Sequence, residues 1–225
     1  MGLRIGADVG GTFTDIVIEL ANGDYSSIKV LTTQTAPEVG ILDGLGRIAD
    51  QEGVSLTDVE QIIHGTTLAT NALIERRGAK TALVTTDGFR DVIETRTESR
   101  FEQYDLNIVL PAPLIQRADR HVVCERLNAR GEELVPFDEI GARALIARIG
   151  EENYASVAVG FIHSYVNPVN EQRFRDLLLA EIPGIACSIS SEVSPQMREF
   201  ERFNTVCANA YVQPLMASYL VRLRD

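Results

Sequence analysis

The beginning of the chain alternates apolar and polar residues and then changes to a helical period. The alternation predicts strands over Leu3 to Val9, Thr14 to Leu20 and Tyr25 to Thr33. Asn22-Gly23-Asp24 is typical of the turn between the second and third strands. From Pro37 to Gly53 apolar residues recur at helical spacing, with proline suited to the first turn and glycine to the stop. We therefore expect an antiparallel three-strand meander followed by an amphipathic helix.

Further along, short apolar strands alternate with helical patterns. Between Asp87 and Pro136 the periodicity is weak, so we expect an irregular excursion that ends in a strand near His121 to Arg126. Alternating β and α elements predict an α/β fold. The predicted elements are strands over Gln61 to His64, Thr81 to Thr85, Ser156 to Phe161 and Ala186 to Ile189, and helices over Thr67 to Arg76, Asp138 to Ile149, Asn170 to Ile182 and a final stretch that includes Ala208 to Leu220.

Charge and composition narrow the possible functions. The chain has 21 lysine and arginine residues against 32 aspartate and glutamate residues, and its net charge of −11 repels nucleic acid and anionic lipid. No apolar stretch approaches the roughly 18 residues of a membrane helix, and the N-terminus lacks the plan of a signal peptide. We expect a soluble, cytoplasmic protein with no nucleic-acid or membrane partner.

The cysteines and histidines show no metal-binding pattern. Cys124, Cys187 and Cys207 are far apart and form no CxxC motif, which argues against a disulfide framework or a thiolate site. The histidines have no short metal-ligand spacing. We expect reduced thiols in the core and no tightly bound transition metal.

The segment IGADVGGTFTDIVI near the N-terminus carries the strongest candidate chemistry. A predicted strand brings Asp8 to its end. Gly10 and Gly11 let backbone amides approach an anion without a Cβ in the way, and Thr12 and Thr14 add hydroxyl donors. The segment is typical of a phosphate-binding turn; the alternative is a plain glycine hairpin with capping side chains.

The spacing distinguishes between phosphate loops. The adjacent glycines match neither GxGxxG nor GxxxxGK[ST], and β-branched residues continue as a second strand instead of a helix. Strand, glycine-rich turn and strand resemble the sugar kinase, Hsp70 and actin superfamily, whose hairpin wraps the β- and γ-phosphates of ATP. That resemblance implies that Asp8 lies close to Mg²⁺, often through a water, because a carboxylate offsets the charge of the cation.

A second polar segment, HGTTLATNAL, lies at a predicted strand-to-helix junction. A helix N-terminus presents free N–H groups and partial positive charge, so His64, Thr66 and Thr67 are candidates to receive an anion or a polar substrate. In the structural alternative, either threonine is the helix cap and His64 is a satisfied core histidine. The residues alone leave both interpretations open.

Several motifs in the same order resemble the N-terminal region of the hydantoinase A/5-oxoprolinase family. The similarity covers nearly the whole chain. The family includes ATP-dependent hydantoinases, 5-oxoprolinases and subunits of ketone carboxylases such as acetone carboxylase. The motifs are DVGGTFTD, HGTTLATNALIERRGAKTALVTTDGFRD, the Arg100-x-x-x-Tyr104-Asp105-Leu106 region, GFIHSYVNPVNE, and SSEVSPQMREFERFNTVCANAYVQPLMASYL.

The resemblance implies a fold, cofactors and partners. The fold is an actin-like ATPase (ribonuclease H-like) half, with a phosphate-binding lobe over 1–86, an irregular insertion over 87–136, a second α/β segment over 137–190 and a C-terminal helix over 191–225. ATP and Mg²⁺ are implied, together with a cyclic amide or ketone substrate whose carbonyl oxygen is activated by phosphorylation. Family members of this type are considerably longer. We therefore expect that a missing C-terminal half or a hydantoinase B-type subunit completes the site.

The resemblance also assigns roles to residues. Asp8 is implied near Mg²⁺, and His64, Thr66 and Thr67 near the reacting end of the substrate. Arg100 is a further catalytic candidate in the irregular excursion. The ATP phosphates are implied to contact Gly10, Gly11, Thr12, Phe13, Thr14 and Asp15.

For the other candidate site residues, a functional and a structural interpretation both remain open. With Arg100, the polar residues Arg96, Tyr104 and Asp105 either line a substrate pocket or form a solvated charged loop. The run REFERF from Arg198 either is a family signature or forms an exposed, self-paired helix face. His163 follows an apolar strand and either carries function or orients the turn. At the level of function, a non-catalytic or truncated module and a small sugar or acid kinase are the alternatives to an enzyme region of this family.

Overall fold

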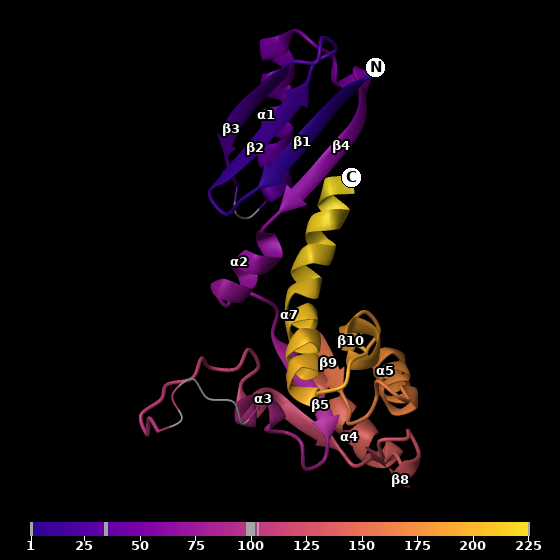
Figure 1. Cartoon of the computed structure of the whole chain (residues 1–225). Helices are drawn as coiled ribbons and strands as arrows, with labels where there is room; N and C mark the ends of the chain where they lie inside the picture. Colours follow the sequence, from indigo (N-terminus) through magenta and orange to yellow (C-terminus); the bar gives the residue numbers. More distant parts are fainter. Residues whose placement is uncertain (1, 34–35, 98–101, 103, 225) are drawn as a thin grey trace. The chain divides into compact units, whose positions relative to one another are not determined.

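The computed structural model describes residues 2–33, 36–97, 102 and 104–224, which form two compact units (Figure 1). Unit 1 comprises Met1–Arg77 with Leu215–Asp225, and unit 2 comprises Gly78–Pro214. The long helix α7 (Glu199–Arg224) continues through Pro214 and contributes to both units. The predicted segment 1–86 therefore includes residues of each unit. Within the described ranges, no helix is both long and apolar enough to cross a membrane.

Unit 1 is a sheet of strand order β3-β2-β1-β4 with helix α1 packed on one face (Figure 1). The β1/β2 and β2/β3 pairs are antiparallel, which confirms the predicted meander, and β4 runs parallel to β1. Alternate side chains of β1, among them Ile5 and Val9, are buried against α1. The elements are β1 (Leu3–Val9), β2 (Phe13–Glu19), β3 (Tyr25–Leu31), α1 (Pro37–Glu52), η1 (Leu56–Asp58), β4 (Val59–Thr66) and α2 (Leu68–Ile74).

Two glycines reverse the chain in unit 1 as predicted. Gly23 has φ +86° in the β2–β3 turn, where the Leu20 amide donates to the Asp24 carbonyl at 2.8 Å. Gly53 ends α1 with φ +63°, a left-handed conformation that costs glycine little because it has no Cβ. The turn and the helix end that the sequence predicts are confirmed.

Unit 2 is a parallel sheet of order β10-β9-β5-β6 with helices on both faces. Helices α4 and α5 cover one face, whereas α3 and the first part of α7 cover the other. The Asp138 carboxylate accepts from the Gly141 amide at 3.0 Å and caps α4, as predicted. The elements are β5 (Thr81–Thr86), α3 (Val92–Thr95), η2 (Arg117–Asp119), β6 (Arg120–Val123), β7 (Arg126–Leu127), β8 (Glu133–Val135), α4 (Glu139–Glu151), β9 (Ser156–Gly160), α5 (Val169–Glu181), β10 (Ala186–Ile189), α6 (Ser190–Val193) and α7.

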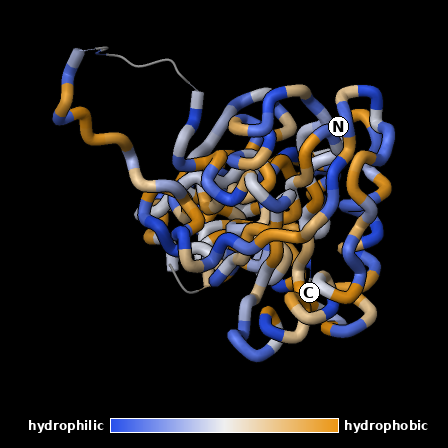
Figure 2. Tube along the Cα trace, turned by 90° about the horizontal axis from the view of Figure 1, so that it is seen from below, coloured by the Kyte–Doolittle hydropathy of each residue, from blue (hydrophilic) through white to orange (hydrophobic). Residues whose placement is uncertain are grey.

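The excursion over 87–136 is more regular than predicted. Its strand β6 joins the main sheet beside β5 and overlaps the strand predicted near His121 to Arg126. Leu106 and Val109 have 97% and 92% of their surface exposed. Figure 2 shows orange, hydrophobic segments interrupted by blue ones along this loop. The cysteines are free, but Cys124 is exposed, so the expectation of a core thiol is wrong there; Cys207 is buried as expected.

Candidate functional site

The β1–β2 turn of unit 1 presents two unengaged backbone donors. The Gly10 amide is already used, because it donates to the Phe13 carbonyl at 2.9 Å and closes the turn. The Thr12 carbonyl accepts from the Thr32 amide at 2.9 Å, which ties the end of β3 to the turn. Among the described residues, no acceptor takes the amides of Gly11 and Thr12, and both residues are exposed. These amides are therefore available to a ligand.

The paired glycines allow close contacts with neighbouring atoms, and their backbone conformation is one that any residue can adopt. Neither Gly10 nor Gly11 has a positive φ. A Cβ on Gly11 would lie 3.0 Å from the Asn71 amide nitrogen, and a Cβ on Gly10 would lie 3.0 Å from the Phe13 carbonyl oxygen. Glycine at position 11 therefore lets the turn pack closely against α2, and glycine at position 10 lets the turn close on Phe13.

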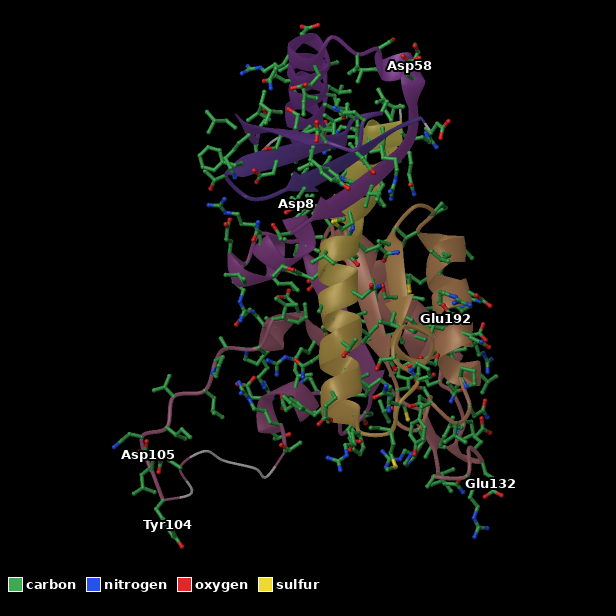
Figure 3. The ribbon with its side chains drawn as sticks, turned by 45° about the horizontal axis from the view of Figure 1, so that its top comes forward. Asp8, Asp58, Tyr104, Asp105, Glu132 and Glu192 are labelled. Atoms are coloured by element: carbon green, nitrogen blue, oxygen red, sulfur yellow. The ribbon has the colours of Figure 1, made fainter. Side chains whose placement is uncertain are left out.

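Asp8 presents an exposed carboxylate at the end of β1 (Figure 3). Its neighbours in register are Asp15 on β2 and Gly65 on β4. A Cβ on Gly65 would approach Asp8 Oδ1 to 3.2 Å, so glycine leaves room for the carboxylate. Within the described part of the chain, Asp8 has no hydrogen bond or ion pair, whereas Asp15 pairs with Lys29 at 2.6 Å. Asp8 is thus the acid of this pair that is available to a cation.

The threonines of the predicted site differ in exposure. Thr14 is fully buried, and its hydroxyl shares a hydrogen bond of 2.9 Å with Thr32. The Thr66 hydroxyl accepts from the Leu68 amide at 3.1 Å and donates to the Val9 carbonyl at 3.3 Å. The Thr67 hydroxyl accepts from Asn71 at 3.2 Å. Thr67 and Thr12 are both exposed, but the hydroxyls of Thr14, Thr66 and Thr67 all have partners within unit 1.

His64 is bonded at both ring nitrogens inside unit 1. Nδ1 lies 3.2 Å from the Ala7 carbonyl oxygen, and Nε2 lies 2.6 Å from the hydroxyl of Tyr219 on α7. A carbonyl oxygen accepts, so in the neutral ring Nδ1 carries the proton and Nε2 accepts from the tyrosine. Burial raises the pKa of Tyr219, which keeps its hydroxyl a donor. His64 is thus a half-buried histidine with a partner at each ring nitrogen.

A cavity of about 230 Å³ lies beside the glycine turn. Its polar lining includes Asn71, Glu75 and Arg77, which the sequence interpretation did not single out. Glu75 and Arg77 form an ion pair at 3.0 Å. The position of Asn71, one helical turn after Thr67, is the signal that could have identified it. The cavity is lined by Val9, Gly10, Gly11, Thr32, Pro37, Leu68, Asn71, Ala72, Glu75, Arg77 and Leu215.

The candidate site residues of unit 2 do not come together in one place. Arg96 and Arg198 line a cavity of about 900 Å³, and both have left-handed backbones, with φ +61° and +84°. Tyr104 and Asp105 lie on the exposed outer loop, where Tyr104 has 93% of its surface exposed (Figure 3). Arg100 lies outside the described residues. His163 has φ +58°, and its carbonyl accepts from the Val166 amide at 2.9 Å, which gives it a place in the turn.

The expectation of an exposed helix face at REFERF is wrong for Arg202. Arg202 is 1% exposed and donates to the Ser190 hydroxyl at 3.0 Å and to the Phe161 carbonyl at 2.9 Å. The Ser190 hydroxyl in turn donates to the buried Glu171 at 2.6 Å. These partners come from the ends of β9 and β10, so local charge alternation does not reveal them. Over the described ranges, no group of three or more histidine, cysteine, aspartate or glutamate side chains is placed to hold a metal ion.

Comparison with known proteins shows which family model and which proteins the chain matches. A family model described as the hydantoinase/oxoprolinase N-terminal region matches residues 4–182. Caprolactamase subunit alpha of Pseudomonas jessenii is 35% identical over 98% of the chain, and the acetophenone carboxylase gamma subunit of Aromatoleum aromaticum is 30% identical over 94%. The 5-oxoprolinase of Saccharomyces cerevisiae is 31% identical over 97%. The chain spans 32%, 31% and 20% of the length of these three proteins.

Two solved structures of related proteins have the same fold as this chain. The crystal structure of ATP-dependent caprolactamase from Pseudomonas jessenii aligns with a TM-score of 0.89 at 35% identity, over 98% of this chain and 33% of that one. Nucleotide-free acetone carboxylase aligns with a TM-score of 0.87 at 24% identity, over 99% and 34%. The predicted α/β class of actin-like type, with its antiparallel meander, is confirmed.

Proposed function

The chain belongs to the hydantoinase/oxoprolinase N-terminal family, and we propose that its unit 1 binds the phosphate groups of ATP for an enzyme that acts on a cyclic amide. The observation that carries this proposal is the β1–β2 turn. There the amides of Gly11 and Thr12, which no acceptor takes among the described residues, lie three and four positions after Asp8, which has no partner among those residues. The similarity to a structure described as ATP-dependent caprolactamase supports the same function.

The residues of the turn fit the chemistry of Mg·ATP. The amides of Gly11 and Thr12 would donate to phosphate oxygens, since peptide N–H groups in a glycine-rich turn attract anions. Asp8 offers the carboxylate oxygen that Mg²⁺ prefers, directly or through water. When bound, Mg·ATP supplies a phosphoryl group that turns a poorly leaving amide oxygen into a good leaving group.

The rest of unit 1 would keep these groups in position. The Thr32 amide and the Thr14–Thr32 hydroxyl pair fix the turn from the β3 side. Asn71 and Thr67 fix α2 beside Gly11. A donor pair that is held before the ligand arrives pays less reorganisation on binding. We assign His64 a positioning role, because its bond to Tyr219 joins β4 to α7.

We further propose that polypeptide outside this chain completes the enzyme. The related proteins are about three to five times as long, and two of them are named as subunits. The additional length would supply the adenosine pocket, and a second subunit of the hydantoinase B type would share the reaction. The similarity to the acetophenone carboxylase gamma subunit favours a second candidate, a ketone carboxylase. ATP hydrolysis by the completed enzyme that depends on a ketone and bicarbonate, and not on a lactam, would select that candidate.

The test is a calorimetric titration of the full chain with Mg·ATP. Asp8→Asn is expected to weaken binding about tenfold or more, equivalent to about 1.4 kcal/mol, because the cation loses its carboxylate. Asp58→Asn, which makes the same charge change at an exposed position of unit 1, is the matched control and is expected to bind normally. Equal affinity of the wild type and Asp8→Asn, or no binding by the wild type, would refute the proposal.

A further inference from the structure

A basic cavity lies at the edge strand of unit 2, away from every residue used above. Its volume is about 550 Å³, and its charged lining is formed by Arg90, Arg117, Arg120, His121, Arg148 and Glu152. Arg117 and Arg120 are paired with Asp91 and Glu94, so the positive charge that is left to a ligand comes from Arg90 and Arg148. In a chain whose net charge is −11, these two arginines form a local site that attracts anions.

Two of these arginines have no partner within the part of the chain that the structure describes. Among the described residues, neither Arg90 nor Arg148 has a side-chain hydrogen bond or ion pair within 4.0 Å. Both lie close enough to His121 that their charges, after the larger effect of burial, lower its pKa. Gathering unpaired positive charge around an imidazole is unfavourable, and an anion between the three groups would relieve it.

The other two arginines are held rigidly. Arg117 makes two bonds to the Asp91 carboxylate, both at 3.1 Å. Arg120 is 3% exposed and donates to Glu94 at 2.7 Å and to the Ile115 carbonyl at 3.0 Å. They therefore form a fixed wall behind the unpartnered pair, and a fixed wall loses little entropy when a ligand binds.

The acids that face His121 share one donor. The Tyr154 hydroxyl lies 2.8 Å from the Asp119 carboxylate and 3.1 Å from the Glu152 carboxylate, and its single proton serves both. Tyr154 also contacts His121, with 3.5 Å between the hydroxyl oxygen and Nε2. Their charges raise the pKa of His121, opposite to Arg148 and Arg90, and burial sets the overall lowering.

We propose that this cavity is a binding site for a small phosphate-type dianion, held by Arg90 and Arg148 beside His121. A tetrahedral dianion offers several oxygens to guanidinium groups that approach from different elements, whereas a monocarboxylate suits one planar fork. The net negative charge of the chain disfavours a polyanion such as nucleic acid. The site lies wholly in unit 2, so it is independent of ATP binding at the β1–β2 turn.

The experiment is a proton NMR titration of the histidine rings of the full chain against sulfate, with chloride at equal ionic strength as the reference. Sulfate keeps its charge across the pH range, and the chain has three histidines, which makes assignment by His121→Asn direct. Sulfate is expected to raise the pKa of His121 by about one unit, because an adjacent anion favours the imidazolium. The pKa of His163 is expected to stay the same.

Variants then identify the anchoring residues. Arg148→Gln and Arg90→Gln are each expected to weaken sulfate binding about tenfold, and inorganic phosphate at pH 8 is expected to follow the same order. Arg130→Gln removes an exposed arginine of the same unit and is expected to bind sulfate normally. Equal responses to sulfate and chloride, or unchanged affinity in Arg148→Gln and Arg90→Gln, would overturn the proposal. Binding that Arg130→Gln weakens equally would overturn it as well.

Discussion

Two acidic side chains near strand ends, one in each unit, differ in burial and in hydrogen bonding. In unit 1, Asp8 at the end of β1 is exposed and has no partner among the described residues. In unit 2, Glu171 lies against the ends of β9 and β10, is fully buried, and accepts from the Phe161 and Ser191 amides, both at 2.9 Å, and from the Ser190 hydroxyl at 2.6 Å. The difference separates an acid that stabilises the fold from one that is free to bind a ligand.

The largest expected effect is on the stability of unit 2. Glu171→Leu takes the acceptor from the buried Phe161 amide and Ser190 hydroxyl and from the partly buried Ser191 amide, and it removes the negative charge near Arg202. We therefore expect a loss of about 3–5 kcal/mol in the free energy of unfolding. Urea denaturation of the full chain measures it. Glu133→Leu, at an exposed acid of the same unit, is expected to change little. If Glu171→Leu changes the free energy of unfolding as little as Glu133→Leu does, the buried Glu171 does not stabilise unit 2 as proposed.

A pH-dependent effect comes next. Glu125 accepts from Thr86 and from Asn170, and burial is the main cause that raises its pKa above the ordinary 4.5. A raised pKa in the folded state stabilises the fold fully below pH 4.5, and this contribution is lost as the pH rises through the raised value. We expect Glu125→Gln to lack that decline in urea denaturation at a series of pH values. An identical pH dependence in both proteins would contradict the assignment.

A smaller effect is expected in unit 1. Tyr219→Phe removes the hydroxyl that bonds His64 and keeps the packing of the ring, so we expect a loss of about 1 kcal/mol in the free energy of unfolding. Denaturation monitored by an amide of β4 reports it. If Tyr219→Phe is as stable as the wild type, His64 is not positioned by α7.

The smallest effect on folding is expected at Asp8. Because its carboxylate has no bond to lose within the described residues, Asp8→Asn is expected to change the free energy of unfolding by less than about 0.5 kcal/mol. The same substitution is expected to impair Mg·ATP binding. Strong destabilisation in thermal or urea unfolding would mean that Asp8 serves the fold, as Glu171 does.

The sequence predicts those parts of the molecule whose signals are local. The meander, α1 and its Gly53 end follow from alternation, helical spacing and a glycine at the stop. The turn between Asp8 and Asp15 follows from one short motif. The partner of His64 does not, since Tyr219 is 155 positions away and meets it only when α7 folds back on the sheet. The burial of Arg202 is hidden for the same reason, because its acceptors Phe161 and Ser190 lie just past the ends of β9 and β10, 41 and 12 positions before it.

The central claim is that the amides of Gly11 and Thr12 are phosphate donors. Backbone NMR of the full chain during a titration with Mg·ATP tests it directly. The account predicts that the amide shifts of Gly11 and Thr12 move most, that the Gly10 amide moves less because it stays bonded to Phe13, and that Asp8→Asn suppresses all three changes. Binding that leaves Gly11 and Thr12 unmoved, or that shifts residues of unit 2 instead, would contradict it.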